Sequence, residues 1–307
     1  MRSPQSPAEP QSVVQAYLNH LAFERRYSAN TCQAVARDLG LLGENPLALA
    51  EPALKSLLAR RHAEGLSPRS LARMASSWRG FYGFLVTEGH LKSSPAEALK
   101  TPKAGKALPK ALSVDQVMAL LQGHWPVDFQ DCQARVLIEL LYGTGLRISE
   151  AMSLRMPGVD KGAASSLDLN SAQLRVVGKG SKTRIIPLIG SLQQTLIQFM
   201  DRRHAYLDEL KLPDPGAFFL SSRGQALTVR LAQHAVSKYA QQKGLSQHLH
   251  PHMLRHSFGS HVLQGSQNLR GVQELLGHAS IASTQVYTAL DFAHLSAVYD
   301  KAFPRAK

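Results

Sequence analysis

Two histidines and an arginine lie close together in the last third of the sequence. His252, Arg255 and His256 fall on one face if this segment is helical, because residues three and four apart are neighbours on a helix. A guanidinium offers a fixed fork of donors to a phosphate, and imidazoles add donors or acid–base capacity. His278 and Tyr287 follow along the chain and could complete such a site. The pattern therefore favours anion binding.

A zinc site is one alternative for the same residues. His252 and His256 have the spacing of zinc ligands on a helix, with His278 as a third ligand. However, Met253 stands where the H-E-x-x-H motif has its glutamate, and Arg255 would place a cation beside the metal. A purely structural role, in which the histidines cap and pack, is the other alternative.

A further arginine follows a glycine-rich turn. In YGTGLRISE, residues 142–150, the two glycines allow a sharp turn that aims Arg147, and Glu150 can orient it. Lys179 lies at the tip of a predicted hairpin, in the segment GKGSK at 178–182. This segment lacks the glycine spacing of a P-loop, so a nucleotide-binding enzyme of that class is not supported.

The elements that must position these residues form a mixed domain from residue 113 to 307. Ser113 and Gln116 have the S-x-x-Q pattern of a capping box at the start of a helix. Gln173–Val177 and Thr183–Pro187 alternate as two strands of a hairpin. Further large segments, most of them helical, are predicted at 136–141, from about 191, and at 229–242, 252–264, 269–276 and 281–289.

Residues 1–100 carry helical periodicity and no strand pattern, which predicts a bundle of four or five helices. Helix starts are expected near residues 13, 28–31, 52 and 68. Residues 101–112 contain two prolines, a glycine and three lysines, which is typical of a basic interdomain linker. The expected fold is mainly α with a small antiparallel β-sheet.

The charge of the chain favours a polyanionic partner. Lysine and arginine number 35 against 22 acidic residues, which gives a net charge of +13, with +4 in residues 1–100 and +9 in residues 101–307. No apolar run approaches the ~20 residues of a membrane span. The N-terminus lacks the apolar core of a signal peptide, so the expected location is cytoplasmic. The two cysteines are too far apart for a C-x-x-C pair.

Five segments, in this order, resemble the tyrosine site-specific recombinases of the phage integrase family: TGLRISE, GKGSKTR, PHMLRHSF, LGH and TQVYT. The segment FERRYSANT at 23–31 resembles the family's N-terminal core-binding domain. Residues 290–307 resemble the C-terminal tail of the branch that resolves chromosome dimers. The resemblance implies a helical core-binding domain, a mixed α/β catalytic domain and a C-terminal interaction tail.

The resemblance also implies six catalytic residues, which are Arg147, Lys179, His252, Arg255, His278 and Tyr287. In these roles the arginines clamp the phosphate, the lysine protonates the leaving 5′-hydroxyl, and the histidines position groups and assist proton transfer. The tyrosine is the nucleophile and forms a 3′-phosphotyrosyl link. Tyrosine has a free pKa of ~10 and needs such cationic neighbours and a base to react. No metal, ATP or other cofactor is implied.

The resemblance implies double-stranded DNA with a dif-type recombination site as the substrate. It also implies a XerD-like partner recombinase in a heterotetramer on DNA, a septal DNA translocase as activator, and no membrane insertion. The candidate DNA contacts are Arg25, Arg26, Thr31, Arg69, Arg73, Lys103, Lys106, Lys110, Lys182, Thr228 and Arg230.

Two features depart from the family pattern. Between Arg147 and Lys179 lie 31 residues, more than is usual, and we interpret the surplus around 161–167 as a surface loop. Lys182 is the fallback for the hairpin lysine. Ala289 stands where close relatives often have a histidine.

Other functions remain open at this point. Within the family, a XerD-like recombinase or a phage or integron integrase is possible. A non-catalytic DNA-binding regulator would be expected to have lost catalytic residues, yet all six are present. A type IB topoisomerase shares the chemistry but fits the short chain and its helical N-terminal domain poorly.

Overall fold

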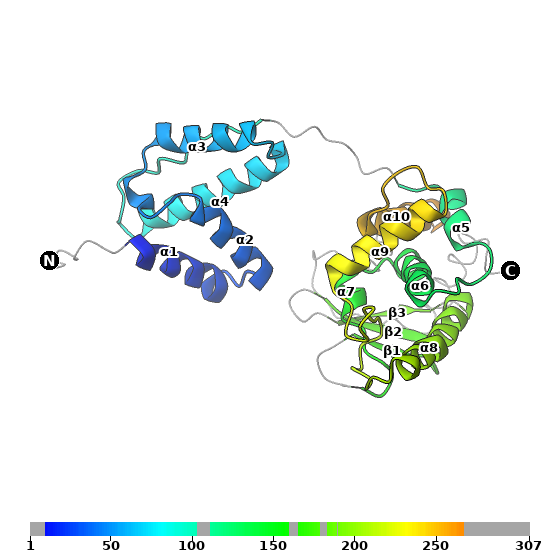
Figure 1. Ribbon diagram of the computed structural model, residues 1–307. Coiled ribbons are helices and arrows are strands. Elements are labelled where there is room, and N and C mark those ends of the chain that lie inside the picture. Colours follow the sequence, from blue (N-terminus) through cyan, green and yellow to red (C-terminus); the bar gives the residue numbers. More distant parts are fainter. Residues whose placement is uncertain (1–9, 103–110, 160–164, 179–182, 189, 267–307) are drawn as a thin grey trace. The chain divides into compact units, whose positions relative to one another are not determined.

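The protein is described here from a computed structural model (Figure 1). The residues that it describes are 10–102, 111–159, 165–178, 183–188 and 190–266. The chain divides into two units, Met1–Ala107 and Leu108–Lys307. Each unit has its own apolar core.

The described part of the first unit is helical. Its elements are α1 (Pro10–Asn19), the π-helix η1 (His20–Glu24), α2 (Ala29–Gly40), the short 3-10 helix η2 (Pro46–Ala48), α3 (Glu51–Ala63) and α4 (Pro68–Thr87). Ser28 and Ser67 cap α2 and α4, and each hydroxyl accepts a hydrogen bond from a backbone N–H three residues on. The helix starts predicted near residues 28–31, 52 and 68 are confirmed.

One face of α4 supplies most of the core of this unit. Trp78, Phe81 and Tyr82 are fully buried. The indole of Trp78 donates to the backbone carbonyl of Asp38 at 2.8 Å. The buried Asp38 carboxylate accepts from Ser77 and pairs with Arg73. Two helices are therefore joined by apolar packing and by a satisfied polar cluster.

The second unit is built around one buried helix. The helices in its described part are α5 (Val114–Leu121), α6 (Phe129–Thr144), α7 (Ile148–Met152), α8 (Gly190–Leu210), α9 (Val229–Gln242) and α10 (Pro251–Ser266). Every residue of α6 from Cys132 to Thr144 is buried, and α8, α9 and α10 all pack on it (Figure 1). The predicted capping box of Ser113 and Gln116 is present at the start of α5. The buried helix α6 therefore supports the elements that carry the site residues.

A three-stranded antiparallel sheet completes the described part of the second unit. Its strands β1 (Ser166–Asp168), β2 (Gln173–Val177) and β3 (Thr183–Pro187) lie in sequence order. The predicted hairpin is confirmed, with Val177 opposite Thr183.

The interpretation of 161–167 as a surface loop is wrong at its C-terminal end. Ser165 is fully buried, and Leu167 is buried in β1, where it pairs with Leu174 of β2. A three-residue strand is too short to produce a recognisable alternation. It forms because the hairpin edge supplies hydrogen-bond partners and the core buries Leu167. Residues 160–164 lie outside the described residues.

The predicted fold class, mainly α with a small antiparallel sheet, is confirmed. The segments predicted at 269–276 and 281–289 lie outside the described residues. In the described part of the chain, no helix has the length and apolar character to cross a membrane.

Candidate active site

Arg147 is placed by the turn that ends α6. Gly145 caps this helix in the left-handed conformation, with φ of 63°. A glycine adopts this conformation without the penalty that a Cβ would bring. Arg147 is then the N-cap of α7, where its backbone N–H donates to Glu150 Oε2 at 2.7 Å. The arginine side chain is 37% exposed, so it can reach a ligand.

Arg255 reaches the same turn from α10. This helix packs on α6, and the Arg255 guanidinium donates through Nη1 to the backbone carbonyl of Gly145. Gly145 precedes Arg147 by two residues, so this hydrogen bond brings two arginines that are distant in sequence to one turn. Arg255 is buried, with 8% of its surface exposed.

Glu150 connects Arg147 to a third arginine. Its carboxylate accepts from Arg147 Nη1 at 3.1 Å and from Arg184 at 2.9 and 2.8 Å. Glu150 was expected to orient Arg147, whereas Arg184 was missed. The sequence signal for Arg184 was its place in β3, two residues before the buried Ile186 and on the same face. A charged residue on an inward face calls for a partner.

The charges of this cluster alter the ionisation of its members. Burial, together with the charge of Arg147, lowers the pKa of Arg255 to about 10; Glu150 opposes this shift and Arg184 adds to it. Burial would raise the pKa of Glu150, but hydrogen bonds from Arg184 and Arg147 and their charges hold it below its usual value. Two guanidinium groups pair with Glu150, and Arg255 is close enough for their charges to alter its pKa, so the cluster has an excess of positive charge and suits a phosphodiester.

The histidines of α10 lie differently from Arg255. His252 and His256 are exposed, whereas Arg255 points into the unit. The His252 ring stacks on His250, with centroids 5.5 Å apart and ring planes within 9°. Across the described residues, no three histidine, cysteine, aspartate or glutamate side chains gather as a metal site requires.

Several predicted site residues lie outside the described residues. They are Lys179, His278 and Tyr287 among the catalytic set, and Lys103, Lys106, Lys110 and Lys182 among the DNA contacts. Of the other predicted DNA contacts, Thr31 is half-buried. Exposed side chains are those of Arg25, Arg26, Arg69, Arg73, Thr228 and Arg230. Their role in DNA binding stays a prediction.

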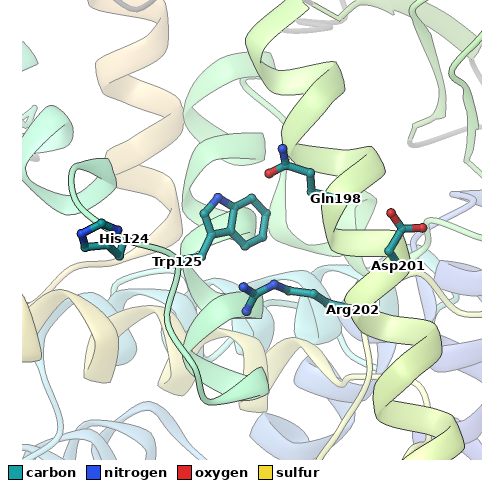
Figure 2. A pocket seen from close by; sticks show the side chains of 5 residues that line it. All are labelled: His124, Trp125, Gln198, Asp201 and Arg202. Carbon is teal, nitrogen blue, oxygen red and sulfur yellow. The ribbon is translucent and has the colours of Figure 1, made fainter.

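A cavity of about 540 Å³ lies elsewhere in the second unit (Figure 2). Its walls include His124, Trp125 and Arg202, but not the arginine cluster. The Arg135 and Arg202 guanidinium carbons lie 5.0 and 5.1 Å from the centroid of the Trp125 ring. Arg202 also donates to the backbone carbonyl of Pro126 at 2.8 Å. These contacts hold the loop before α6 in place, which is a structural role.

Comparisons with known proteins identify the family. Residues 110–294 match the phage integrase family, and residues 14–89 match its N-terminal SAM-like domain. Tyrosine recombinase XerC of Pseudomonas fluorescens is 44% identical over 309 residues, which cover 97% of this chain and 98% of the relative. The chain belongs to the phage integrase family of tyrosine recombinases.

Two further relatives of this recombinase are also similar over nearly their whole length. Tyrosine recombinase XerC 1 of Ralstonia nicotianae is 41% identical over 98% of this chain and 96% of its own length. Tyrosine recombinase XerC of Pseudomonas aeruginosa is 43% identical over 95% of this chain and 94% of its own length.

Solved structures confirm the fold of the recombinase. The Tn1549 transposon integrase in complex with transposon right end DNA has a TM-score of 0.66 at 19% identity, covering 92% of this chain and 96% of the other. A lambda integrase dimer bound to a core site has a TM-score of 0.63 at 18% identity, covering 90% of this chain and 99% of the other.

Proposed function

We propose that this recombinase cleaves and rejoins DNA at a specific site through a 3′-phosphotyrosyl intermediate. The observation that carries the proposal is the cluster of Arg147 and Arg255 at one turn, in a chain 41–44% identical over nearly its whole length to relatives named XerC. The net charge of +13 supports a nucleic-acid substrate.

In the proposed reaction, the Tyr287 hydroxyl attacks the scissile phosphorus and passes its proton to a base, a transfer that His252 and His278 assist. The new bond joins the tyrosine oxygen to phosphorus, and the bond from phosphorus to the 5′-oxygen breaks. Lys179 gives a proton to the leaving 5′-oxygen. Arg147 and Arg255 stabilise the negative charge that develops on the non-bridging oxygens. A 5′-hydroxyl from a second strand then reverses the step, so the energy of the phosphodiester is conserved.

The remaining groups have supporting roles in this proposal. His252 and His278 position the phosphate and assist proton transfer. His252 is exposed at the start of α10, one turn before Arg255, which is compatible with access to a bound duplex. We assign no step to a metal, ATP or another cofactor.

We further propose a dif-type site on the chromosome as the substrate, and therefore a cytoplasmic location. A XerD-like recombinase would complete the heterotetramer, a septal DNA translocase would activate it, and residues 290–307 would contact the partner subunit. The three relatives described above are named XerC, and these names support this choice over a XerD-like recombinase or a phage integrase.

A suicide duplex tests the reaction. It carries the dimer-resolution site of the source chromosome and a nick that lets the cleaved strand diffuse away. We expect a covalent protein–DNA adduct with the wild type and with Tyr299→Phe. With Tyr287→Phe we expect no adduct and nearly unchanged DNA affinity.

Two other outcomes would contradict the proposal. An adduct that persists in Tyr287→Phe but disappears in Tyr299→Phe would assign the nucleophile elsewhere. Specific binding without any adduct, with or without the XerD-like protein of the same source, would favour a non-catalytic regulator. If the adduct forms but its yield does not change when that protein is added, the proposed partner is wrong.

A further inference from the structure

Arg184 is a charged residue on the inward face of a strand. In the register of β2 and β3, Arg184 lies opposite Val176, and Ile186 lies opposite Leu174. Val176, Leu174 and Ile186 are all buried. Side chains alternate along a strand, so Arg184 shares the core-facing side with Ile186. Only 13% of its side chain is exposed.

The guanidinium of Arg184 forms a bidentate ion pair with Glu150 through both of its terminal nitrogens. Nη1 donates to Oε1 at 2.9 Å and Nη2 donates to Oε2 at 2.8 Å. This is the two-pronged pairing that arginine makes with a carboxylate and that lysine cannot reproduce. Glu150 is itself only 6% exposed, so its orientation is strongly restricted by this pairing.

The same two carboxylate oxygens hold Arg147. Oε2 accepts from the Arg147 backbone at 2.7 Å, and Oε1 accepts from its Nη1 at 3.1 Å. Arg147 has a half-exposed side chain and would otherwise sample several rotamers. Glu150 therefore couples the position of β3 to that of Arg147, the arginine that the proposed function assigns to the phosphate.

The pairing also joins a strand to the turn that follows α6. Arg184 is the second residue of β3, and Glu150 lies in α7, which begins directly after Arg147. One ion pair thus fixes the start of β3 at the turn of Arg147.

We propose that Arg184 is a positioning residue for DNA cleavage: it orients Arg147 through Glu150. This inference rests on the proposed function, because it assumes that Arg147 binds the scissile phosphate. Stability alone is a poor explanation of the residue. The Arg184 Nε is buried without an acceptor among the described residues, and a well-packed apolar side chain often stabilises a fold at least as well as a buried ion pair.

The experiment compares Arg184→Gln with Arg184→Lys and with a control in the same sheet. Arg175 lies on β2 opposite Ile185, on the other face of the sheet, so Arg175→Gln removes an equal charge without touching Glu150. For each purified full-length variant, three quantities are measured: the single-turnover rate of adduct formation at saturating suicide duplex, the DNA Kd and the Tm.

We expect Arg184→Gln to lower the maximal rate about 100-fold, because a displacement of catalytic groups by ~1 Å can cost that much. Its DNA Kd should stay within about twofold of wild type, since the remaining phosphate contacts are unchanged. The cleavage rate of Arg184→Lys should lie between those of wild type and Arg184→Gln, because lysine keeps the charge but cannot make the two-pronged pairing. Arg175→Gln should cleave like wild type.

A double variant tests the route through Glu150. If Arg184 acts through this carboxylate, then Arg184→Gln combined with Glu150→Gln should be no slower than the slower of the two single variants. Multiplying losses would show that Arg184 acts independently, and would overturn the proposal.

Two further results separate this inference from the proposed function. If Arg147→Gln cleaves at the wild-type rate, the proposed role of Arg147 fails, and the inference fails with it. If Arg147→Gln is inactive while folded Arg184→Gln cleaves at the wild-type rate, the role of Arg147 stands and only the positioning role of Arg184 is wrong. Should Arg184→Gln prove unfolded by its Tm, the rate of Arg184→Lys below its own Tm decides in the same way.

Discussion

At the scale of single residues, Glu150 determines the balance of charge in the site. It is the carboxylate that pairs with both Arg147 and Arg184, and its field opposes the lowering of the Arg255 pKa. Removal of Glu150 would destabilise the folded protein in two ways. The remaining guanidinium groups repel one another, and Arg184 is left buried without its counter-charge.

Glu150→Gln should lower the free energy of unfolding at pH 7 by about 3 kcal/mol, the lower end of the cost of removing one partner from a buried pair. The pKa of Glu150 is lower in the folded protein than its usual 4.5, so the unfolded chain binds protons first as the pH falls. Its stabilising contribution is therefore complete above about pH 4.5 and is lost as the pH falls through the folded pKa.

Urea titrations between pH 7 and pH 3 check this prediction. The difference between wild type and Glu150→Gln should shrink below pH 4.5. Glu209→Gln, which changes an exposed carboxylate on α8, should stay close to wild type throughout. A constant difference between wild type and Glu150→Gln at every pH would contradict the assigned ionisation.

At the scale of elements, α6 and its neighbours place the two arginines. Helix α6 ends at Gly145, and Arg255 of α10 donates to the carbonyl of this glycine. A second contact joins the same two helices, because Tyr142 of α6 shares a hydrogen bond of 2.9 Å with His261 of α10. The residue before the N-cap of α5 also contacts α10: the backbone N–H of Leu112 donates to the hydroxyl of Ser257 at 2.8 Å. The start of α5 therefore connects directly to the helix that carries Arg255.

The capping box of α5 gives a test at this scale. The hydroxyl of Ser113 accepts from the Gln116 N–H at 3.2 Å, and the Gln116 side chain accepts from the Ser113 N–H at 2.9 Å. Ser113→Ala should lower the free energy of unfolding by about 1 kcal/mol, because one helix N–H loses its acceptor. Ser113→Asp retains an acceptor and should recover most of the loss. Chemical denaturation measures both, and equal stabilities of wild type and Ser113→Ala would rule out the cap.

At the scale of the whole molecule, the chain joins two units that each bury their own core. The positive charge is shared between them, with +6 in residues 1–107 and +7 in residues 108–307. A charge distributed in this way favours phosphate contacts from both units rather than from a single basic arm.

Salt dependence of DNA binding tests this distribution. The slope of log affinity against log salt is about −0.9 for each phosphate neutralised. The full chain should therefore give a steeper slope than residues 108–307 alone, which have their own core and are expected to fold. Filter-binding or anisotropy titrations at several salt concentrations supply both slopes. Equal slopes would mean that the first unit neutralises no phosphate.

Local features of the sequence were enough to predict much of this protein. Helix starts at Ser28, Ser67 and Ser113 follow from short-range capping, which needs only neighbouring residues. The β2–β3 hairpin follows from alternation on both sides of a glycine-containing turn. Ordered short motifs were also enough to predict the family, because several of them together are specific even though each alone is not.

Contacts between distant residues were decided only by the tertiary structure. Arg184 pairs with Glu150 across 34 positions, and Arg255 reaches the Gly145 carbonyl across 110. Helical periodicity placed His252, Arg255 and His256 on one face, but it could not tell that the arginine is buried while both histidines are exposed. Strand β1 likewise depends on an edge that only the folded hairpin provides. Periodicity and capping act within a few residues, whereas these contacts depend on which buried surfaces meet when the chain packs around α6.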